Sequence, residues 1–280
     1  MRHQLLLLSM IGILLISCNE ELDVEIVNPH IEKLIAYSLP TTERYAQGMD
    51  IIDGCFFQAY SDGTIDVISL ETKAKLQTIE SLLDENGKVL HMNDISFRDE
   101  DGQHTLVIPG NDINSIISIF DVEQDEQGLY CLQKIKEIQP PLLDSKKYIG
   151  STQYFGDGDD IVQVAYKRTE TDWYGDIIVE GYTFNTINED IIYSKQWTIE
   201  HEQLWAMQGS VIVNNNCYMI VGVPQGDARI YRIDMKNGSL SCYIDLRLGN
   251  NLTKNEEMQG IAFYNNFFYI STTYGLYKLQ

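Results

Sequence analysis

A twelve-residue motif occurs twice in the C-terminal part of the chain, displaced by 51 residues. Residues 207–218 and 258–269 both begin with Met-Gln-Gly, contain Asn-Asn and end in Tyr, with six of twelve positions identical. A third copy at 47–57 begins with Gln-Gly and has Asp53-Gly54 in place of the Asn pair. Asn-Asn and Asp-Gly tolerate the positive φ of a tight turn, and apolar residues alternate on both sides. Each copy therefore predicts a β-hairpin.

The segments after these hairpins repeat as well. A third strand is expected at 65–68, 117–120, 230–233 and 276–279, and a fourth strand follows a turn-prone stretch at 75–79, 129–135 and 240–246. The unit is thus four antiparallel strands. Units begin near Gly48, Asn93, Gly150, Gly209 and Gly260, and their length of roughly 45 to 60 residues brackets the period of a propeller blade.

This pattern resembles that of β-propellers, and the resemblance implies an all-β, five-bladed β-propeller in a single domain over residues 31–280. Six blades are the alternative, if the least regular segment, 149–200, holds a second short blade. No stretch shows the periodicity of an amphipathic helix. The last unit ends at Leu279-Gln280 after its third strand. The strand-like run Ile31–Tyr37 is therefore expected to pair there as an N-terminal velcro strand and to cover the exposed edge.

The N-terminus resembles the signal peptide of bacterial lipoproteins. Residues 1–17 hold Arg2, His3 and a short apolar run, which ends in Leu15-Ile16-Ser17-Cys18. That tetrapeptide resembles the lipobox, in which the cysteine receives the lipid and becomes the mature N-terminus. The resemblance implies lipidation at Cys18 and attachment to a membrane through the lipid anchor.

Residues 18–30 are expected to form an acidic tether. Glu20, Glu21, Asp23 and Glu25 follow the cysteine closely. Such a run resembles the signal that sends some Gram-negative lipoproteins to the outer face of the outer membrane, so cell-surface display is expected. A merely solvated tether is the alternative.

The overall charge excludes one class of partner. The chain has 41 acidic against 20 basic residues and a formal charge of −21. A protein that holds nucleic acid must present a basic face to the phosphates, so no nucleic-acid partner is expected. The four cysteines after Cys18 lie in apolar-alternating runs and are interpreted as buried free thiols. No metal or cofactor is expected, since Asp157–Asp160 lacks a full calcium loop and no Cys-x-x-Cys occurs.

Residues just before the innermost strand of each blade should surround one mouth of the central channel, where ligands commonly bind. These candidates are polar and aromatic: Arg44, Gln47, His91, Tyr148, Trp205, Gln208, Glu257 and Gln259. Amides both donate and accept hydrogen bonds and aromatic rings cover apolar sugar faces, so the set suits a glycan. Alternatively, the recurring Gln47, Gln208 and Gln259 hydrogen-bond neighbouring blades.

The sequence favours a binding or scaffolding module for a glycan or a protein ligand. The competing class is a propeller enzyme with its site in the funnel. The Gln-Gly entry segments resemble those of the five-bladed glutaminyl cyclotransferases, which implies such an activity, although residues 58–63 lack the Glu-Ser and Tyr-Gly elements of that family. A glycoside hydrolase would need paired carboxylates, with Asp50, Asp94 and Glu257 as candidates, or His91 as a base. None of these is singled out as catalytic.

Overall fold

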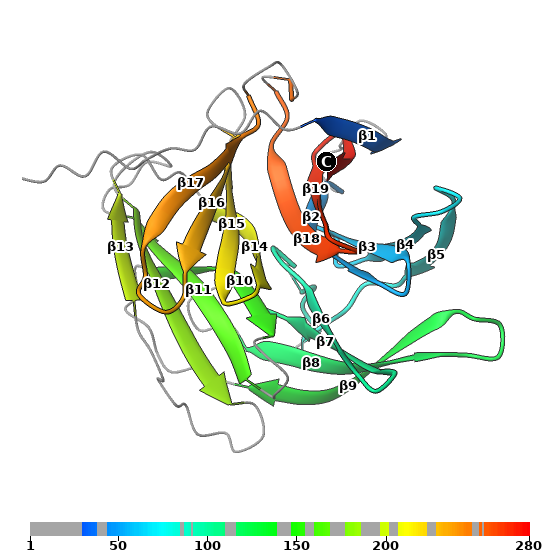
Figure 1. The fold of residues 1–280 in the computed structure, drawn as a ribbon. Coiled ribbons are helices and arrows are strands. Elements are labelled where there is room, and N and C mark those ends of the chain that lie inside the picture. Colours follow the sequence, from blue (N-terminus) through cyan, green and yellow to red (C-terminus); the bar gives the residue numbers. More distant parts are fainter. Residues whose placement is uncertain are drawn as a thin grey trace, which may run out of the picture.

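The computed structural model describes most of the chain after residue 29. The described ranges are 30–37, 44–84, 87–90, 92–109, 116–138, 147–154, 160–168, 177–185, 197–201, 207–222, 228–247, 252–253 and 255–280. Regular structure in these ranges consists of β-strands alone (Figure 1). No helix within them is long and apolar enough to cross a membrane.

The strands in this part of the chain form five four-stranded antiparallel sheets. The first sheet contains β2 (Ala46–Ile52), β3 (Cys55–Tyr60), β4 (Ile65–Ser69) and β5 (Lys75–Ile79). The second contains β6 (Ser96–Glu100), β7 (Gln103–Ile108), β8 (Ile117–Gln124) and β9 (Tyr130–Ile138). The third contains β10 (Lys147–Tyr154), β11 (Asp160–Arg168), β12 (Ile177–Asn185) and β13 (Trp197–His201). The fourth contains β14 (Met207–Val213), β15 (Asn216–Gly222), β16 (Ala228–Asp234) and β17 (Leu240–Asp245). The fifth contains β18 (Met258–Tyr264), β19 (Phe267–Thr272), β20 (Gly275–Leu279) and the N-terminal β1 (Ile31–Ala36).

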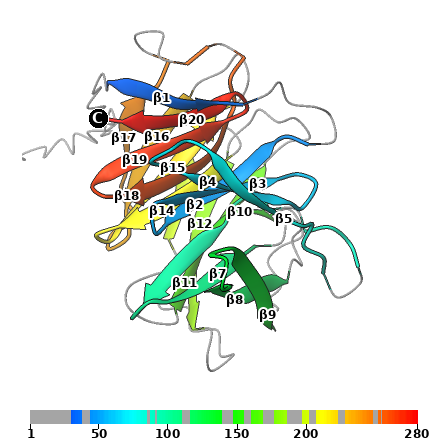
Figure 2. The same cartoon turned by 90° about the vertical axis from the view of Figure 1, so that its right-hand side faces the viewer.

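The sheets are arranged as in a β-propeller (Figures 1 and 2). The first strand of each sheet contacts the first strands of the two neighbouring sheets, in the order β2, β6, β10, β14, β18 and back to β2. These five inner strands define a common axis. Apolar side chains fill the space between neighbouring sheets, as where the Phe57 ring meets those of Phe97 and Tyr130 at centroid distances of 4.6 and 4.9 Å.

The repeated turn residues adopt the backbone that the sequence predicts. Non-glycine residues with φ between 49° and 63° occupy three hairpin turns, at Asp53, Asn214, Asn215, Asn265 and Asn266, and Gly54 has φ 71°. In each hairpin only two residues separate the last paired positions, as Val213 opposite Asn216 shows. Positive φ at the central residues gives the turn a twist that matches that of the flanking strands. The three predicted hairpins are therefore confirmed.

The glycine of the repeated motif allows inner strands to approach each other closely. A Cβ on Gly48 would lie 2.3 Å from Cα of Asp94, and the Gly48 amide donates to the Met92 carbonyl at 3.0 Å. A Cβ on Gly260 would lie 2.9 Å from the Met49 nitrogen. The pairing register of β2, β14 and β18 shifts at this motif. A side chain at either glycine would therefore collide with the backbone of the neighbouring sheet.

One predicted feature of the cysteines is wrong. Cys217 is a buried free thiol, as expected, and Cys55 is a partly buried one, but Cys131 is exposed. Cys131 lies on β9, the outermost strand of its sheet, where successive side chains point to opposite faces and those on the side of Cys131 are exposed near the start of the strand. Apolar alternation in the sequence did not distinguish this outer strand from an inner one.

The N-terminal strand lies at the C-terminal end of the fold. β1 pairs antiparallel with β20, from Ile31 opposite Leu279 to Ala36 opposite Gly275. Both views show the dark-blue β1 beside the red C-terminal strands (Figures 1 and 2). A Cβ on Gly275 would lie 2.3 Å from the Ile35 carbonyl oxygen and 2.8 Å from Cε of Lys33.

Gly275→Ala should therefore destabilise the protein by about 1–3 kcal/mol, the usual cost of overpacking, measured by urea unfolding. The cost should arise only where β1 is present. In a chain that lacks residues 31–37 the same substitution is expected to cost little, although that chain is itself less stable. An equal cost in both backgrounds would contradict the pairing of β1 with β20.

Candidate functional site

Four of the predicted mouth residues lie in one hydrogen-bonded group, here called the mouth network: Gln47, Gln208, Glu257 and Gln259. The amide Nε2 of Gln208 donates to Oε1 of Glu257 at 2.8 Å. The amide Nε2 of Gln47 donates to Oε1 of Gln259 at 3.4 Å. The network thus links the first, fourth and fifth sheets where their inner strands begin. This favours the reading in which the recurring glutamines join neighbouring sheets.

Part of the mouth network remains open to solvent. Gln47 and Gln259 are buried, whereas Gln208 and Glu257 are partly exposed. Burial raises the pKa of Glu257 to about 7, although its hydrogen bond to Gln259 acts in the opposite direction. Near neutral pH the Glu257 carboxyl therefore exists in both protonation states. It can donate or accept a hydrogen bond beside the Gln208 amide.

The segment that presents Glu257 is fixed by its neighbours. The Glu257 amide donates to Thr273 Oγ1 at 3.3 Å, and the Thr273 amide donates to the Glu257 carbonyl at 2.9 Å. The preceding Glu256 is buried and accepts hydrogen bonds from the Thr253 amide at 2.8 Å and from the Tyr277 hydroxyl. Glu257 is therefore held on a rigid support.

Gln58 holds the backbone of the neighbouring inner strand in place. Its buried amide Nε2 donates to the carbonyl oxygens of Gln47 at 2.9 Å, Gly48 at 3.1 Å and Ala59 at 2.9 Å. Its Oε1 accepts from the Tyr37 hydroxyl at 3.0 Å. The register of β2 and β3 shifts between Ala46 and Met49, and the Gln58 amide supplies hydrogen bonds to carbonyl groups at this shift. Gln58 is therefore a structural residue beneath the mouth.

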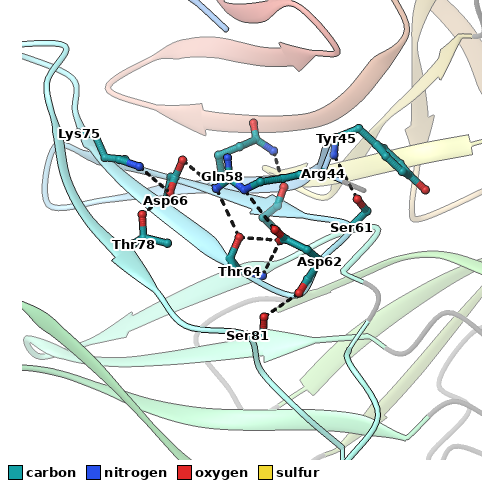
Figure 3. A network of polar contacts seen from close by, with 11 residues as sticks. Arg44, Tyr45, Gln58, Ser61, Asp62, Thr64, Asp66, Lys75, Thr78 and Ser81 are labelled. Atoms are coloured by element: carbon teal, nitrogen blue, oxygen red, sulfur yellow. Dashed lines mark hydrogen bonds and ion pairs between the residues drawn. The ribbon is translucent and has the colours of Figure 1, made fainter. Parts of the chain in front are cut away.

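Arg44, another predicted mouth residue, belongs to a structural cluster on the first sheet (Figure 3). Its Nε lies 3.3 Å from Oδ2 of Asp62, its Nη2 lies 3.0 Å from Oδ2 of Asp66, and its guanidinium stacks 3.5 Å from the Tyr60 ring centroid. Asp66 also accepts from Thr78 Oγ1 at 2.7 Å. Two carboxylates thus compensate the Arg44 charge, which favours a role in fixing the entry to β2.

A second polar group lies at the propeller axis and is called the axis cluster: Asp94, Ser151, Gln153 and Ser210. All four are buried. The Asp94 carboxyl accepts from Ser151 Oγ, and from Gln153 Nε2 at 2.8 Å. The Ser151 and Ser210 hydroxyls are also hydrogen-bonded to each other. Burial raises the pKa of Asp94 well above its usual range, although its hydrogen bonds to Ser151 and Gln153 oppose the shift.

The three acids proposed from the sequence have different environments. Asp94 is enclosed at the axis. Asp50 accepts hydrogen bonds from the Ile51 and Phe97 amides, both at 2.7 Å, and burial raises its pKa to about 7. It therefore bridges β2 and β6 through the backbone. Of the three, Glu257 has its carboxyl in the partly exposed mouth network.

Several predicted residues fall outside the described part of the structure. Cys18, His91 and Trp205 are not among the described residues, and most of Asp157–Asp160 is not either. Tyr148 lies in β10 opposite Tyr166, and its side chain is outside the description. Among the described residues, no three His, Cys, Asp or Glu side chains are grouped so as to hold a metal ion.

Sequence reasoning missed the two serines of the axis cluster. A signal was available, because Gly-Ser occurs at 150–151 and again at 209–210, each time at a shift in strand register. Glycine permits the close approach. The Ser151 hydroxyl then reaches the buried Asp94 carboxyl, and the Ser210 hydroxyl reaches Ser151.

Comparison with known proteins identifies the fold and no family. No family model and no curated protein matches the sequence. Among solved structures, the chain is similar to the glutaminyl cyclase of Myxococcus xanthus, with 12% sequence identity, a TM-score of 0.54, and coverage of 91% of this chain and 98% of that one. The structure of U3-55K is also similar, at 9% identity and a TM-score of 0.45, with coverage of 89% and 98%. The first similarity supports the β-propeller fold.

The raised pKa of Glu257 predicts a pH dependence of stability. Its pKa is about 7 in the folded protein against 4.5 for an unperturbed group, so the folded state binds more protons between these values. The free energy of unfolding should therefore fall as pH rises from about 4.5 to about 7. Glu257→Gln removes this contribution. Relative to the parent, the variant should gain about 1–2 kcal/mol between pH 4.5 and 8, a value reduced because the side chain is partly exposed.

Urea unfolding across this pH range measures the effect. Glu71→Gln, which removes an exposed carboxylate elsewhere on the first sheet, is the matched control and should follow the parent. If Glu257→Gln also follows the parent at every pH, the Glu257 carboxyl titrates normally.

Proposed function

We propose that this protein is a lipid-anchored β-propeller of the cell envelope, attached through Cys18 and displayed at the outer face of the outer membrane. We further propose that its mouth binds a neutral, hydroxyl-rich ligand such as a glycan. The anchor rests on the Leu15–Cys18 motif and the acidic run behind it. The binding role rests on the mouth network.

The proposed architecture is a closed ring of five blades. In this proposal each four-stranded sheet is one blade, and β1 supplies the outer strand of the last one. The cyclic contacts among the inner strands and the pairing of β1 with β20 support it. A closed ring leaves the mouth as a rigid rim, which suits a binding module because little conformational entropy is lost on binding.

The observation that supports ligand binding most directly is the partly exposed pair of Gln208 and Glu257, 2.8 Å apart. An amide and a carboxyl that titrates near neutrality offer both donors and acceptors side by side. Hydroxyl groups need such mixed partners. Gln47 and Gln259 are buried, so in this proposal they contact the ligand less. Gln259 orients Glu257 through a hydrogen bond and is itself bonded by Gln47.

An enzyme is the second candidate. One solved structure with a similar fold is a glutaminyl cyclase, and the pKa of about 7 suits Glu257 to general acid–base catalysis at neutral pH. Turnover distinguishes the two candidates. A catalytic mouth would convert peptides with N-terminal glutamine, or hydrolyse a glycan, whereas a binding mouth would leave both unchanged.

Cys18→Ala should abolish attachment to the membrane. The variant should remain an unprocessed precursor or appear as soluble protein, whereas the parent should partition into detergent, as followed by phase separation and immunoblotting. Unchanged detergent partitioning of Cys18→Ala would contradict the anchor.

Surface display is tested separately by replacing Glu20, Glu21 and Asp23 together. That variant should stay lipidated but become protected from external protease.

Gln208→Ala should weaken binding of neutral oligosaccharides at least about tenfold, because one partner of a hydrogen-bonded pair is lost. The probes are cello-, malto-, manno- and fully N-acetylated chitin oligosaccharides, and the readout is isothermal titration calorimetry with the purified protein. Glu71→Gln should bind as the parent does. If none of the four series gives heat with the parent, or if Gln208→Ala binds equally well, the glycan proposal is wrong. Hydrolysis of a probe would favour the enzyme.

A further inference from the structure

A cavity of about 720 Å³ lies between the first and second sheets, at the end of the inner strands away from the mouth network. The β2–β3 turn contributes Asp53, and β6 to β9 contribute the remaining lining residues. Its volume is within the range of small-molecule sites in proteins, about 300–1,000 Å³. Nothing in the proposed function uses it.

The rim of this cavity is strongly acidic. Five carboxylates line it, at Asp53, Asp99, Glu100, Asp121 and Glu123, against the single cation Arg98 among the lining residues. Arg98 is already engaged, since its Nη2 lies 3.0 Å from Oε2 of Glu100 and its guanidinium lies 5.1 Å from the Tyr154 ring centroid. The cavity therefore presents negative charge to a ligand.

The floor of the cavity contains a buried hydroxyl without a hydrogen-bond partner of normal geometry among the described residues. Tyr130 is 4% exposed, and among the described residues its hydroxyl has no hydrogen-bond partner of normal geometry, although Cys55 and Gln124 lie beside it. The residue is firmly held, because its amide and carbonyl both bond the Gln77 side chain at 2.8 Å. Burial raises the pKa of Tyr130, so the hydroxyl keeps its proton. A buried, unpaired hydroxyl costs free energy unless a ligand or water satisfies it.

Further buried polar atoms of the lining lack a hydrogen-bond partner among the described residues. Thr105 Oγ1 and His104 Nδ1 are among them. His104 is oriented by its other nitrogen, which lies 2.9 Å from Oδ2 of Asp53, whereas Nδ1 is 3.7 Å from Oδ1 of Asp99, too far for a hydrogen bond. The cavity thus combines an anionic rim with a floor of fixed polar atoms.

We propose that this cavity binds a small organic cation that carries hydroxyl groups, such as an amino sugar or an amino alcohol. Its ammonium group pairs with the rim carboxylates around Asp53 and Asp99. Its hydroxyls pair with the Tyr130 and Thr105 hydroxyls. A metal ion fits less well, because no metal-binding group of His, Cys, Asp or Glu occurs among the described residues.

The test is isothermal titration calorimetry with glucosamine, glucose and putrescine as probes. Glucosamine has both the charge and the hydroxyls, glucose has the hydroxyls alone, and putrescine has the charge alone. Glucosamine should bind at least about tenfold more tightly than either of the others. No heat with glucosamine overturns the proposal. Equal binding of glucose overturns the role of the rim, and equal binding of putrescine overturns that of the floor.

Two variants locate the site. Asp53→Asn keeps a residue that tolerates the φ of 50° at this turn and should weaken glucosamine binding about tenfold, whereas the control Glu71→Gln should not. Tyr130→Phe should weaken it several-fold without lowering the melting temperature, since among the described residues the hydroxyl has no hydrogen-bond partner of normal geometry. A lower melting temperature for Tyr130→Phe would assign the hydroxyl a structural role and overturn its part in binding. Asp53 and Tyr130 both lie outside the mouth network, so a loss of affinity in these variants assigns glucosamine binding to this cavity.

Discussion

The close contact of backbones around the propeller axis is the constraint on which the other features depend. Gly48 and Gly260 lie where any Cβ would collide with the next inner strand. Without side chains at these points, neighbouring sheets come near enough for Asp94 to be enclosed by Ser151, Gln153 and Ser210. The same approach brings Gln47 to Gln259 at the mouth. One small residue in a repeat thus sets the spacing of both polar groups.

The axis and the mouth differ in what they allow a carboxyl to do. At the axis, the Asp94 carboxyl is fully enclosed and its hydrogen bonds end on neighbouring sheets, so it is part of the framework. At the mouth, Glu257 shares a similar position just before an inner strand but keeps contact with solvent. Burial raises the pKa of both groups, and of the two only Glu257 is exposed enough to exchange its proton with solvent.

Local features of this chain were predictable from sequence, whereas contacts between sheets were not. Asp53-Gly54 and the Asn pairs predict hairpins because positive φ is a property of the turn residues themselves. The mouth position of Gln208 and Gln259 follows from their place at the start of an inner strand. The enclosure of Asp94 depends on strands 57 and more residues away, as the contact with Ser151 shows, and alternation cannot indicate it. Likewise, the pairing of Arg44 with Asp66 and of Asp53 with His104 depends on how strands and sheets meet in space.

The axis cluster also has a consequence for how the chain reaches its native state. Asp94 obtains its partners only when β10 has joined the ring, and the Ser151 hydroxyl obtains its own second partner only when β14 has done so. In a half-assembled ring the Asp94 carboxyl would remain hydrated and would lack these partners. Closure around it without β10 and β14 in register would bury the carboxyl with its hydrogen bonds unmade, which is costly. Correct closure of the ring therefore requires these sheets to dock together. Because these contacts join distant segments, the rate of folding should be slow for a chain of this length.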